Sequence, residues 1–297
     1  GAIRMVTLAP ERPGALSAVA RIVAEGAVAA VGHTEATYEQ TRAAIDVGAT
    51  VGTHLFNAMA PVHHREPGPV IALLEDPRVT VELIADRVHL HPSLYRQVAG
   101  LVGINRVSLV TDAMAAAGMP DGDYRLGSLP VRVDAGVARV AGTETIAGST
   151  ATMDRVFANA VADGGPGGDA ELLAAVRAAC VNPARALGLS PRGLVAGAGA
   201  DLVVLDTDLV VSAVMRSART VRPCRVTSIR TTPRPRARRT LVRSAGSAAG
   251  CGASWSLLCR ADRDWDSTCR SAPSRRADSS TVTPSWARMG ATKSCRS

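Results

Sequence analysis

Five short runs of β-branched and apolar residues recur through the first part of the chain, and their spacing constrains the fold more than any other feature of this sequence. The runs lie at 6–9, 28–31, 49–53, 80–85 and 107–110. Successive runs start 22, 21, 31 and 27 residues apart, which is the length of one strand plus one crossover helix. The segments between them have helical periodicity, as at Leu16, Val19, Ala20 and Val23. The sequence therefore predicts an α/β fold with a parallel sheet.

Four of these runs lead directly into a polar residue. The residues are His33, His54, Asp86 and Asp112. In a β/α barrel the carboxyl ends of the strands meet at one face, and that face holds the active site. A doubly wound sheet also has strands this apolar, and a single histidine after a strand is usually an ordinary loop residue. Four such endings in consecutive units favour a barrel with a functional site.

The types of these polar residues point to metal chemistry. His33 and His54 are one βα unit apart, so their neutral imidazoles could bind one divalent metal, with Zn²⁺ and Fe²⁺ the best candidates. Asp112, at a third strand end, could then take a proton from a water bound to that metal, because coordination lowers the pKa of the water to about 7. Arg65, in the segment HHREPG, suits an anionic group of a substrate, and a loop salt bridge with Glu66 explains it equally well. Together these residues predict metal-assisted hydrolysis.

The last 86 residues differ in composition from the rest. They contain 17 Arg, one Lys and four Asp, whereas residues 1–211 contain 16 Arg against 22 Asp and Glu, so the net charge of +8 comes from the tail. Few apolar residues remain there to form a core, and we predict a disordered or out-of-frame segment. A nucleic-acid-binding arm is less favoured, because no aromatic residues alternate with the Arg cluster at 234–243. The four Cys between 251 and 295 lack the CxxC pairs of a zinc site.

The sequence also indicates a compartment. It has no run of 18 uncharged apolar residues, which excludes a membrane-spanning helix, and its first residues do not have the pattern of a signal peptide. Cys180 is the single Cys in residues 1–211 and is interpreted as a small buried apolar residue. We therefore expect a cytoplasmic protein without a disulfide framework.

Eight segments, in chain order, resemble those of the N-acetylglucosamine-6-phosphate deacetylases, a family of the metal-dependent amidohydrolase superfamily. They are VTLAPE (6–11), VGHTEAT (31–37), THLFNAM (53–59), HHREPG (63–68), IADRVH (84–89), LVTDAM (109–114), IAGST (146–150) and NPARALGL (182–189). The resemblance implies about the last five strands of a (β/α)8 TIM barrel in residues 1–192, with a β-meander inserted at about 120–142. Residues 193–222 would be returning strands of a small β-sandwich, and the tail, 223–297, lies outside the resemblance.

The resemblance also implies a role for individual residues. His33 and His54 would be metal ligands, and Asp112 would be the general base and then acid in hydrolysis of the acetamide of N-acetyl-D-glucosamine 6-phosphate. Arg65 would bind the 6-phosphate, in a homodimer whose subunits share their sites. The remaining substrate contacts would come from Asn57, Ala58, Asp86, His89, Ile146, Ala147 and Gly148.

One departure from the family pattern affects the metal site. The family's third metal ligand is a glutamate from a segment before VTLAPE, and the printed sequence does not include that segment. Glu11 belongs to VTLAPE itself and is not expected to replace this ligand. Five strands do not close a barrel, so we expect these 297 residues alone to be poorly soluble and without deacetylase activity. The alternative is a catalytically silent remnant whose basic tail binds polyanions nonspecifically.

Overall fold

The computed structural model describes residues 2–191, 193, 195–196, 198–216, 219–221 and 256–257. Most of the basic tail, including the Arg cluster at 234–243 and all of its Cys residues, lies outside the described residues, so the predictions made for it stay predictions. Within the described residues, no helix has both the length and the apolar character needed to cross a membrane.

A five-stranded parallel sheet forms the centre of the molecule. Its strands are β1 (Met5–Leu8), β2 (Val28–Val31), β3 (Ala49–Gly52), β4 (Thr80–Leu83) and β5 (Val107–Leu109). They pair in chain order, each parallel to the next. The predicted strand and crossover-helix repeat is therefore confirmed. Because every strand runs the same way, all five carboxyl ends lie along one edge of the sheet.

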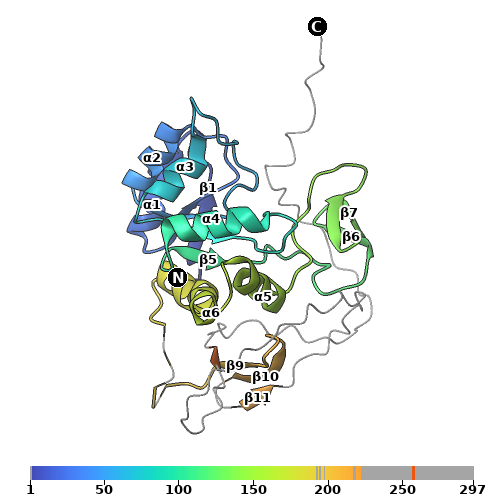
Figure 1. Ribbon diagram of the computed structural model, residues 1–297. Helices are drawn as coiled ribbons and strands as arrows, with labels where there is room; N and C mark the ends of the chain where they lie inside the picture. The colour runs from blue at the N-terminus through green and yellow to red at the C-terminus, as the bar shows by residue number, and fades with distance from the viewer. Residues whose placement is uncertain are drawn as a thin grey trace, which may run out of the picture. The chain divides into compact units, whose positions relative to one another are not determined.

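Four helices connect these strands. They are α1 (Ala15–Ala24), α2 (Tyr38–Asp46), α3 (Gly68–Glu75) and α4 (Pro92–Val102). They lie together on one side of the strands, and each contacts the next along the chain (Figure 1). Local sequence sets where they begin: at α2, for example, the side chain of Thr37 accepts from the N–H of Gln40, and the Gln40 side chain accepts from the N–H of Thr37.

The main core lies between the sheet and these helices. It contains fully buried strand residues such as Val31, Val81 and Leu83, which pack with Ile45 of α2 and Leu73 of α3. Burial of each such side chain stabilises the fold by about 1.5–3 kcal/mol. This core fixes the strands relative to one another, and so fixes the positions of the residues that follow them.

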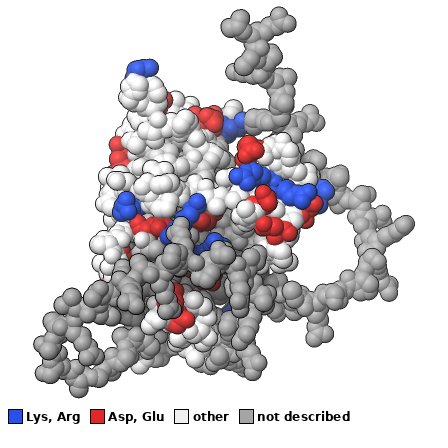
Figure 2. Space-filling model, turned by 45° about the vertical axis from the view of Figure 1, so that its right-hand side comes forward, with Lys and Arg blue, Asp and Glu red and all other residues white. Residues whose placement is uncertain are grey.

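A separate three-stranded antiparallel sheet follows β5. It consists of β6 (Gly122–Leu126), β7 (Leu129–Asp134) and β8 (Val137–Val140). One face covers a second small core that includes Met114, Val131 and Val133. On the other face basic and acidic side chains are mixed rather than separated by sign (Figure 2), with ion pairs between Arg132 and Asp123 and between Arg139 and Glu144. Such exposed pairs contribute little to stability.

The remaining described residues form helices and one more sheet. The helices are α5 (Met153–Asp163), α6 (Asp169–Val176), the π-helix η1 (Arg177–Val181) and α7 (Asn182–Ala186). The sheet contains β9 (Leu202–Leu205), β10 (Val211–Arg216), β11 (Arg219–Val221) and β12 (Ser256–Leu257), in the order β11-β10-β9-β12. The two residues of β12 belong to the tail, for which we predicted a disordered or out-of-frame segment. They pair antiparallel with β9, on the side opposite β10.

Candidate active site

The backbone adopts an unfavourable conformation at three of the predicted strand-end residues. The φ angle is 50° at His33, 30° at His54 and 50° at Asp112, all in the left-handed region that residues other than glycine rarely adopt. Each such residue costs about 1–3 kcal/mol and persists only where the surrounding fold enforces it, most often at functional sites. Of the eight non-glycine residues described with a positive φ, these three coincide with predicted site residues that follow strands; Arg87, Ala135 and Leu209 show that the conformation also occurs elsewhere.

The structure brings the two predicted metal ligands together. The Nε2 atoms of His33 and His54 are 2.9 Å apart, the ring centroids are 4.7 Å apart and the ring planes are inclined by 72°. Gly32 permits this approach, because a Cβ at that position would lie 2.7 Å from the Cβ of Thr53. His54 is buried, and this burial, together with the nearby His33, lowers the pKa of its imidazole. A lowered pKa favours the neutral ring, which is the form that binds a metal ion.

The donor set fits a divalent cation in part. Two facing imidazole nitrogens are ligands that Zn²⁺ and Fe²⁺ accept. Within the residues that the structure describes, however, no group of three or more His, Cys, Asp and Glu side chains is arranged to hold a metal ion. His33 and His54 therefore supply two ligands, and Glu11 does not supply a third: its carboxylate accepts hydrogen bonds from the hydroxyl of Thr34 and the N–H of Glu35.

Two carboxylates lie beside the imidazole pair, and one of them was not predicted. Asp112 is exposed, and its charge acts on both His54 and Glu82. Glu82, on β4, is largely buried; burial raises its pKa to about 6, opposed by a hydrogen bond from the backbone of His54. Glu82 was not predicted because it lies within β4, whereas the pattern that was used contains only residues that follow strands. A carboxylate in the middle of an apolar strand was the signal that could have found it.

Asn57 and Ala58 lie in the loop that follows β3, where the loop joins the end of β2. The Asn57 amide donates to the carbonyls of His54 and Leu55, at 3.1 and 3.3 Å. The carbonyl of Ala58 accepts from the N–H of Thr34 at 2.9 Å. These hydrogen bonds hold the loop close to both imidazoles.

Arg65 lies on an exposed loop. The alternative interpretation, a salt bridge between Arg65 and Glu66, is not formed among the described ion pairs; the Glu66 carboxylate accepts instead from the backbone N–H groups of Tyr38 and Gly68. The guanidinium contacts His64 Nε2 at 2.7 Å. In the described part of the chain, the hydrogen bonds of Arg65 are with His63 and His64 and not with His33, His54 or Asp112, so this subunit alone does not connect the arginine to the imidazole pair.

Asp86 and His89 form a buried pair after β4. Nδ1 of His89 lies 2.7 Å from Oδ2 of Asp86, and both side chains are almost entirely buried. Burial alone would raise the pKa of Asp86, but hydrogen bonds from His89, Ser149 and the backbone lower it to about 2. The segment of Ile146, Ala147 and Gly148 lies against the Asp112 loop: a Cβ added to Gly148 would be 3.0 Å from the Asp112 carbonyl oxygen.

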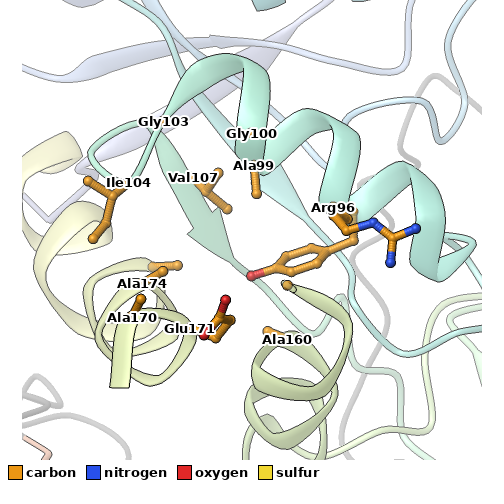
Figure 3. A pocket seen from close by; sticks show the side chains of 13 residues that line it. Arg96, Ala99, Gly100, Gly103, Ile104, Val107, Ala160, Ala170, Glu171 and Ala174 are labelled. Carbon is orange, nitrogen blue, oxygen red and sulfur yellow. The ribbon is translucent and has the colours of Figure 1, made fainter. Parts of the chain in front are cut away.

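A cavity of about 280 Å³ lies elsewhere, between α4, α5, α6 and η1. Its walls are mostly alanine and glycine, and Figure 3 shows Arg96 and Glu171 at its sides. It contains none of the predicted site residues. The candidate active site is therefore the open edge where the strands end, and not this cavity.

Comparison with known proteins decides the family. The sequence model of the amidohydrolase family matches residues 2–232. The chain belongs to the amidohydrolase family. The resemblance to N-acetylglucosamine-6-phosphate deacetylases and the predicted partial amidohydrolase barrel are both confirmed by this match and by relatives of known structure.

Several of these relatives are deacetylases. The N-acetylglucosamine-6-phosphate deacetylase of Lysinibacillus sphaericus is 37% identical over 218 residues, covering 73% of this chain and 55% of that protein. The N-acetylgalactosamine-6-phosphate deacetylase of Escherichia coli O157:H7 is 41% identical over 211 residues, covering 70% and 54%. The crystal structure of N-acetyl-D-glucosamine-6-phosphate deacetylase from Mycobacterium smegmatis is 67% identical with a TM-score of 0.71, covering 73% and 58%. This amidohydrolase thus spans about half the length of the curated relatives it matches.

Proposed function

We propose that this site hydrolyses the acetamide of N-acetyl-D-glucosamine 6-phosphate, giving D-glucosamine 6-phosphate and acetate. The observation that carries the proposal is the pair of facing imidazoles, His33 and His54, beside the Asp112 carboxylate at one edge of the sheet. The deacetylase relatives support the same reaction. The relative that acts on the N-acetylgalactosamine phosphate makes the epimeric sugar the second substrate to test.

Amidohydrolases generally use a divalent metal, and His33 and His54 would hold it here, with Zn²⁺ or Fe²⁺ the expected ion. The ion, when bound, supplies a positive charge that polarises the acetamide carbonyl and lowers the pKa of a water molecule. The lowered pKa of His54 keeps its ring neutral and available as a ligand.

Asp112 carries the proton transfers. Its exposed carboxylate takes a proton from the attacking water, whose oxygen forms a bond with the carbonyl carbon. When the C–N bond breaks, Asp112 returns that proton to the amine nitrogen, so that the carboxylate is regenerated and the products are an amine and acetic acid. The second proton of the water then passes from the acetic acid to the amine, which gives the ammonium form of the sugar phosphate and acetate. Asp112 lies just beyond β5 with a φ of 50°, in the left-handed region that is found most often at functional sites.

The remaining residues bind the substrate. Arg65, with no carboxylate partner in the described region, would bind the 6-phosphate, in a homodimer where the two subunits share their sites. Asn57 and Ala58 would contact the sugar from the loop after β3, and His89 would do so from the loop after β4. Asp86 would act through His89, and Ile146, Ala147 and Gly148 would close over the sugar. We place this reaction in the cytoplasm, with neither membrane nor nucleic acid as a partner.

The role of Asp112 is tested by the substitution Asp112→Asn. Because the five described strands do not close a barrel, the assay uses residues 1–222 joined behind the part of the Mycobacterium smegmatis relative that this chain does not match. Acetate release from both sugar phosphates is measured. We expect Asp112→Asn to lower kcat by about 10²–10⁴-fold, with the metal content per chain unchanged.

Two results would contradict this. Wild-type turnover by the Asp112→Asn variant would show that Asp112 does not carry the proton. Metal-replete fusion protein that releases acetate from neither sugar phosphate would overturn the proposed reaction. Exposed Asp134→Asn, on β7, is the matched control for loss of one carboxylate, and it should keep the parent rate.

A further inference from the structure

Ser149 lies where three segments of the site meet. It is only 2% exposed and directly follows the Ile146–Ala147–Gly148 segment. Its N–H donates to the carbonyl of Asp112 at 2.8 Å, and its own carbonyl accepts from the N–H of Met114 at 3.0 Å. Its hydroxyl donates to Oδ2 of Asp86 at 2.7 Å and accepts from the N–H of Ala151 at 3.0 Å. A single buried residue therefore contacts the loops that follow both β4 and β5.

The partner of this hydroxyl, Asp86, is fully engaged within the protein. Oδ1 accepts from the N–H groups of Val88 and His89, at 2.9 and 2.8 Å. Oδ2 lies 2.7 Å from both Nδ1 of His89 and Oγ of Ser149. The Asp86 side chain is 3% exposed. With four hydrogen bonds inside the protein, Asp86 has no oxygen left for a substrate.

The hydrogen bonds of Asp86 determine the tautomer and the orientation of His89. A carboxylate that stays ionised accepts a hydrogen bond from the N–H at Nδ1 of the ring. The neutral ring therefore carries its proton on Nδ1, which leaves Nε2 as the nitrogen available to another partner. The direction in which Nε2 points depends on where Asp86 Oδ2 is held. Among the described residues, one side chain other than His89 hydrogen-bonds that oxygen: it is Ser149, 63 positions from Asp86 in sequence.

We propose that Ser149 is a positioning residue for the substrate site: its hydroxyl fixes Asp86 and, through Asp86, the tautomer and orientation of His89, while its backbone ties the same segment to Asp112. The inference rests on the proposed function for the identity of the substrate, and on the hydrogen bonds of Ser149, Asp86 and His89 for the geometry. It predicts different effects for the two connections, because a substitution removes the hydroxyl but keeps the backbone bond to Asp112.

A spectroscopic experiment tests the connection to His89 without any catalysis. The fusion protein described above is labelled with ¹⁵N-histidine, and long-range ¹H–¹⁵N spectra report the tautomer of each ring; His89→Gln assigns the His89 signals. We expect the wild type to show Nδ1–H at His89, and Ser149→Ala to show a mixture of tautomers, as Asp86→Asn should. Ser108→Ala, an equally buried serine on β5, is the matched control and should leave the spectrum unchanged.

A kinetic experiment then tests the connection to the substrate, in the fusion protein described above. Loss of a hydrogen bond to a buried carboxylate corresponds to about a 10-fold or larger change in an equilibrium constant. We expect Ser149→Ala to raise KM about 10-fold and to change kcat much less, since the Asp112 bond is retained. In the double variant with Asp86→Asn, the increase in KM should not exceed that of the larger single variant, because the two residues act through one contact.

The outcomes separate the two proposals. A wild-type His89 spectrum in Ser149→Ala, or additive increases in KM, would overturn the role of Ser149 even in an active enzyme. A fusion protein with no turnover in its wild-type form would overturn the proposed reaction, and the spectra would still decide whether Ser149 holds His89. If Ser149→Ala does not fold, Ser149→Cys replaces it, because the thiol has nearly the same volume but is a weak donor.

Discussion

Single residues at the strand ends adopt conformations and charge states that are unfavourable in isolation. Gly148 has a φ of 84° and lies against the Asp112 carbonyl, so the loop over the site depends on the absence of a side chain. Glu82 is partly buried on β4, and this burial, with a smaller contribution from the charge of Asp112, raises its pKa. Both features cost stability locally and are maintained by the packed core around them.

Replacing Gly148 by alanine should displace the Asp112 loop. The new Cβ would meet the Asp112 carbonyl oxygen at 3.0 Å and the Met114 side chain at 3.2 Å, in a backbone conformation that already disfavours alanine. We expect a loss of about 1–3 kcal/mol in the free energy of unfolding, measured by chemical denaturation. Gly142→Ala is the control, because Gly142 has a similar φ of 78° with open space around it. Equal losses in the two variants would show that the contact with Asp112 has no effect.

Replacing Glu82 by glutamine should stabilise the metal-free fusion protein at high pH only. A folded-state pKa of about 6, above the ordinary value, means that the folded state disfavours the charged form. This penalty is absent below pH 4, grows as the pH rises through 6 and reaches about 2 kcal/mol by pH 8. Denaturation of Glu82→Gln at pH 4 and pH 8 should therefore show a gain only at pH 8. Exposed Glu144→Gln should show no such dependence, and a gain for Glu82→Gln at both values would contradict the assignment.

At the scale of elements, buried side chains bind the carbonyl groups that helix and strand ends leave open. Nδ2 of Asn182 donates to the carbonyls of Ile104 and Val107, at 2.9 and 2.7 Å, and so joins the start of α7 to the start of β5. The guanidinium of Arg106 donates to the carbonyls of Val79 and Leu73, at 2.7 and 3.0 Å. These contacts satisfy backbone groups that would otherwise be buried without a partner.

Asn182→Ala should loosen the junction of α7 with β5. Two buried carbonyls lose their donor, and each unsatisfied group costs about 1–3 kcal/mol, of which relaxation recovers part. We expect thermal denaturation to show a net loss of about 2 kcal/mol or more. Gln97→Ala, which removes an exposed side-chain amide on α4, should change stability by less than about 0.5 kcal/mol. An Asn182→Ala variant with unchanged stability would mean that water replaces the amide as the donor to the two carbonyls.

At the scale of the whole molecule, the central sheet is open. In the described part of the chain β1 pairs only with β2, and β5 pairs only with β4. Edge strands of a buried parallel sheet present unpaired N–H and C=O groups, which promote association with other chains. A barrel of the amidohydrolase type removes both edges by closing the sheet.

Closing the sheet should therefore change solubility as well as activity. We expect residues 1–222 alone to aggregate, and the fusion with the unmatched part of the Mycobacterium smegmatis relative to run as a defined oligomer in size-exclusion chromatography with light scattering. A fusion to an unrelated soluble domain of similar length is the control, and it should still aggregate. If residues 1–222 are monodisperse, the open edges do not cause aggregation. If they release acetate in a metal-dependent reaction, the two imidazoles are sufficient to hold the metal for catalysis.

Much of the fold could be predicted because its signals are local. The five βα units follow from residue spacing, and each strand was placed within about two residues of its position. The residues at the strand ends were equally visible, since parallel strands place their carboxyl ends along one edge wherever the strands lie in the sheet. Roles for Asn57, Ala58, Arg65, His89 and the 146–148 segment came from the resemblance, and they stay predictions.

The sequence by itself determined the repeated strand and helix units, the family and the edge at which the chemistry is expected. Only the tertiary structure decided which side chains meet there. The contact between His33 and His54 joins residues 21 positions apart, and that between Ser149 and Asp86 joins residues 63 apart. Such contacts depend on strand register, on close approach at Gly32 and on left-handed turns after the strands. A local pattern cannot specify them, because they form only when the packed core holds separate segments at fixed positions.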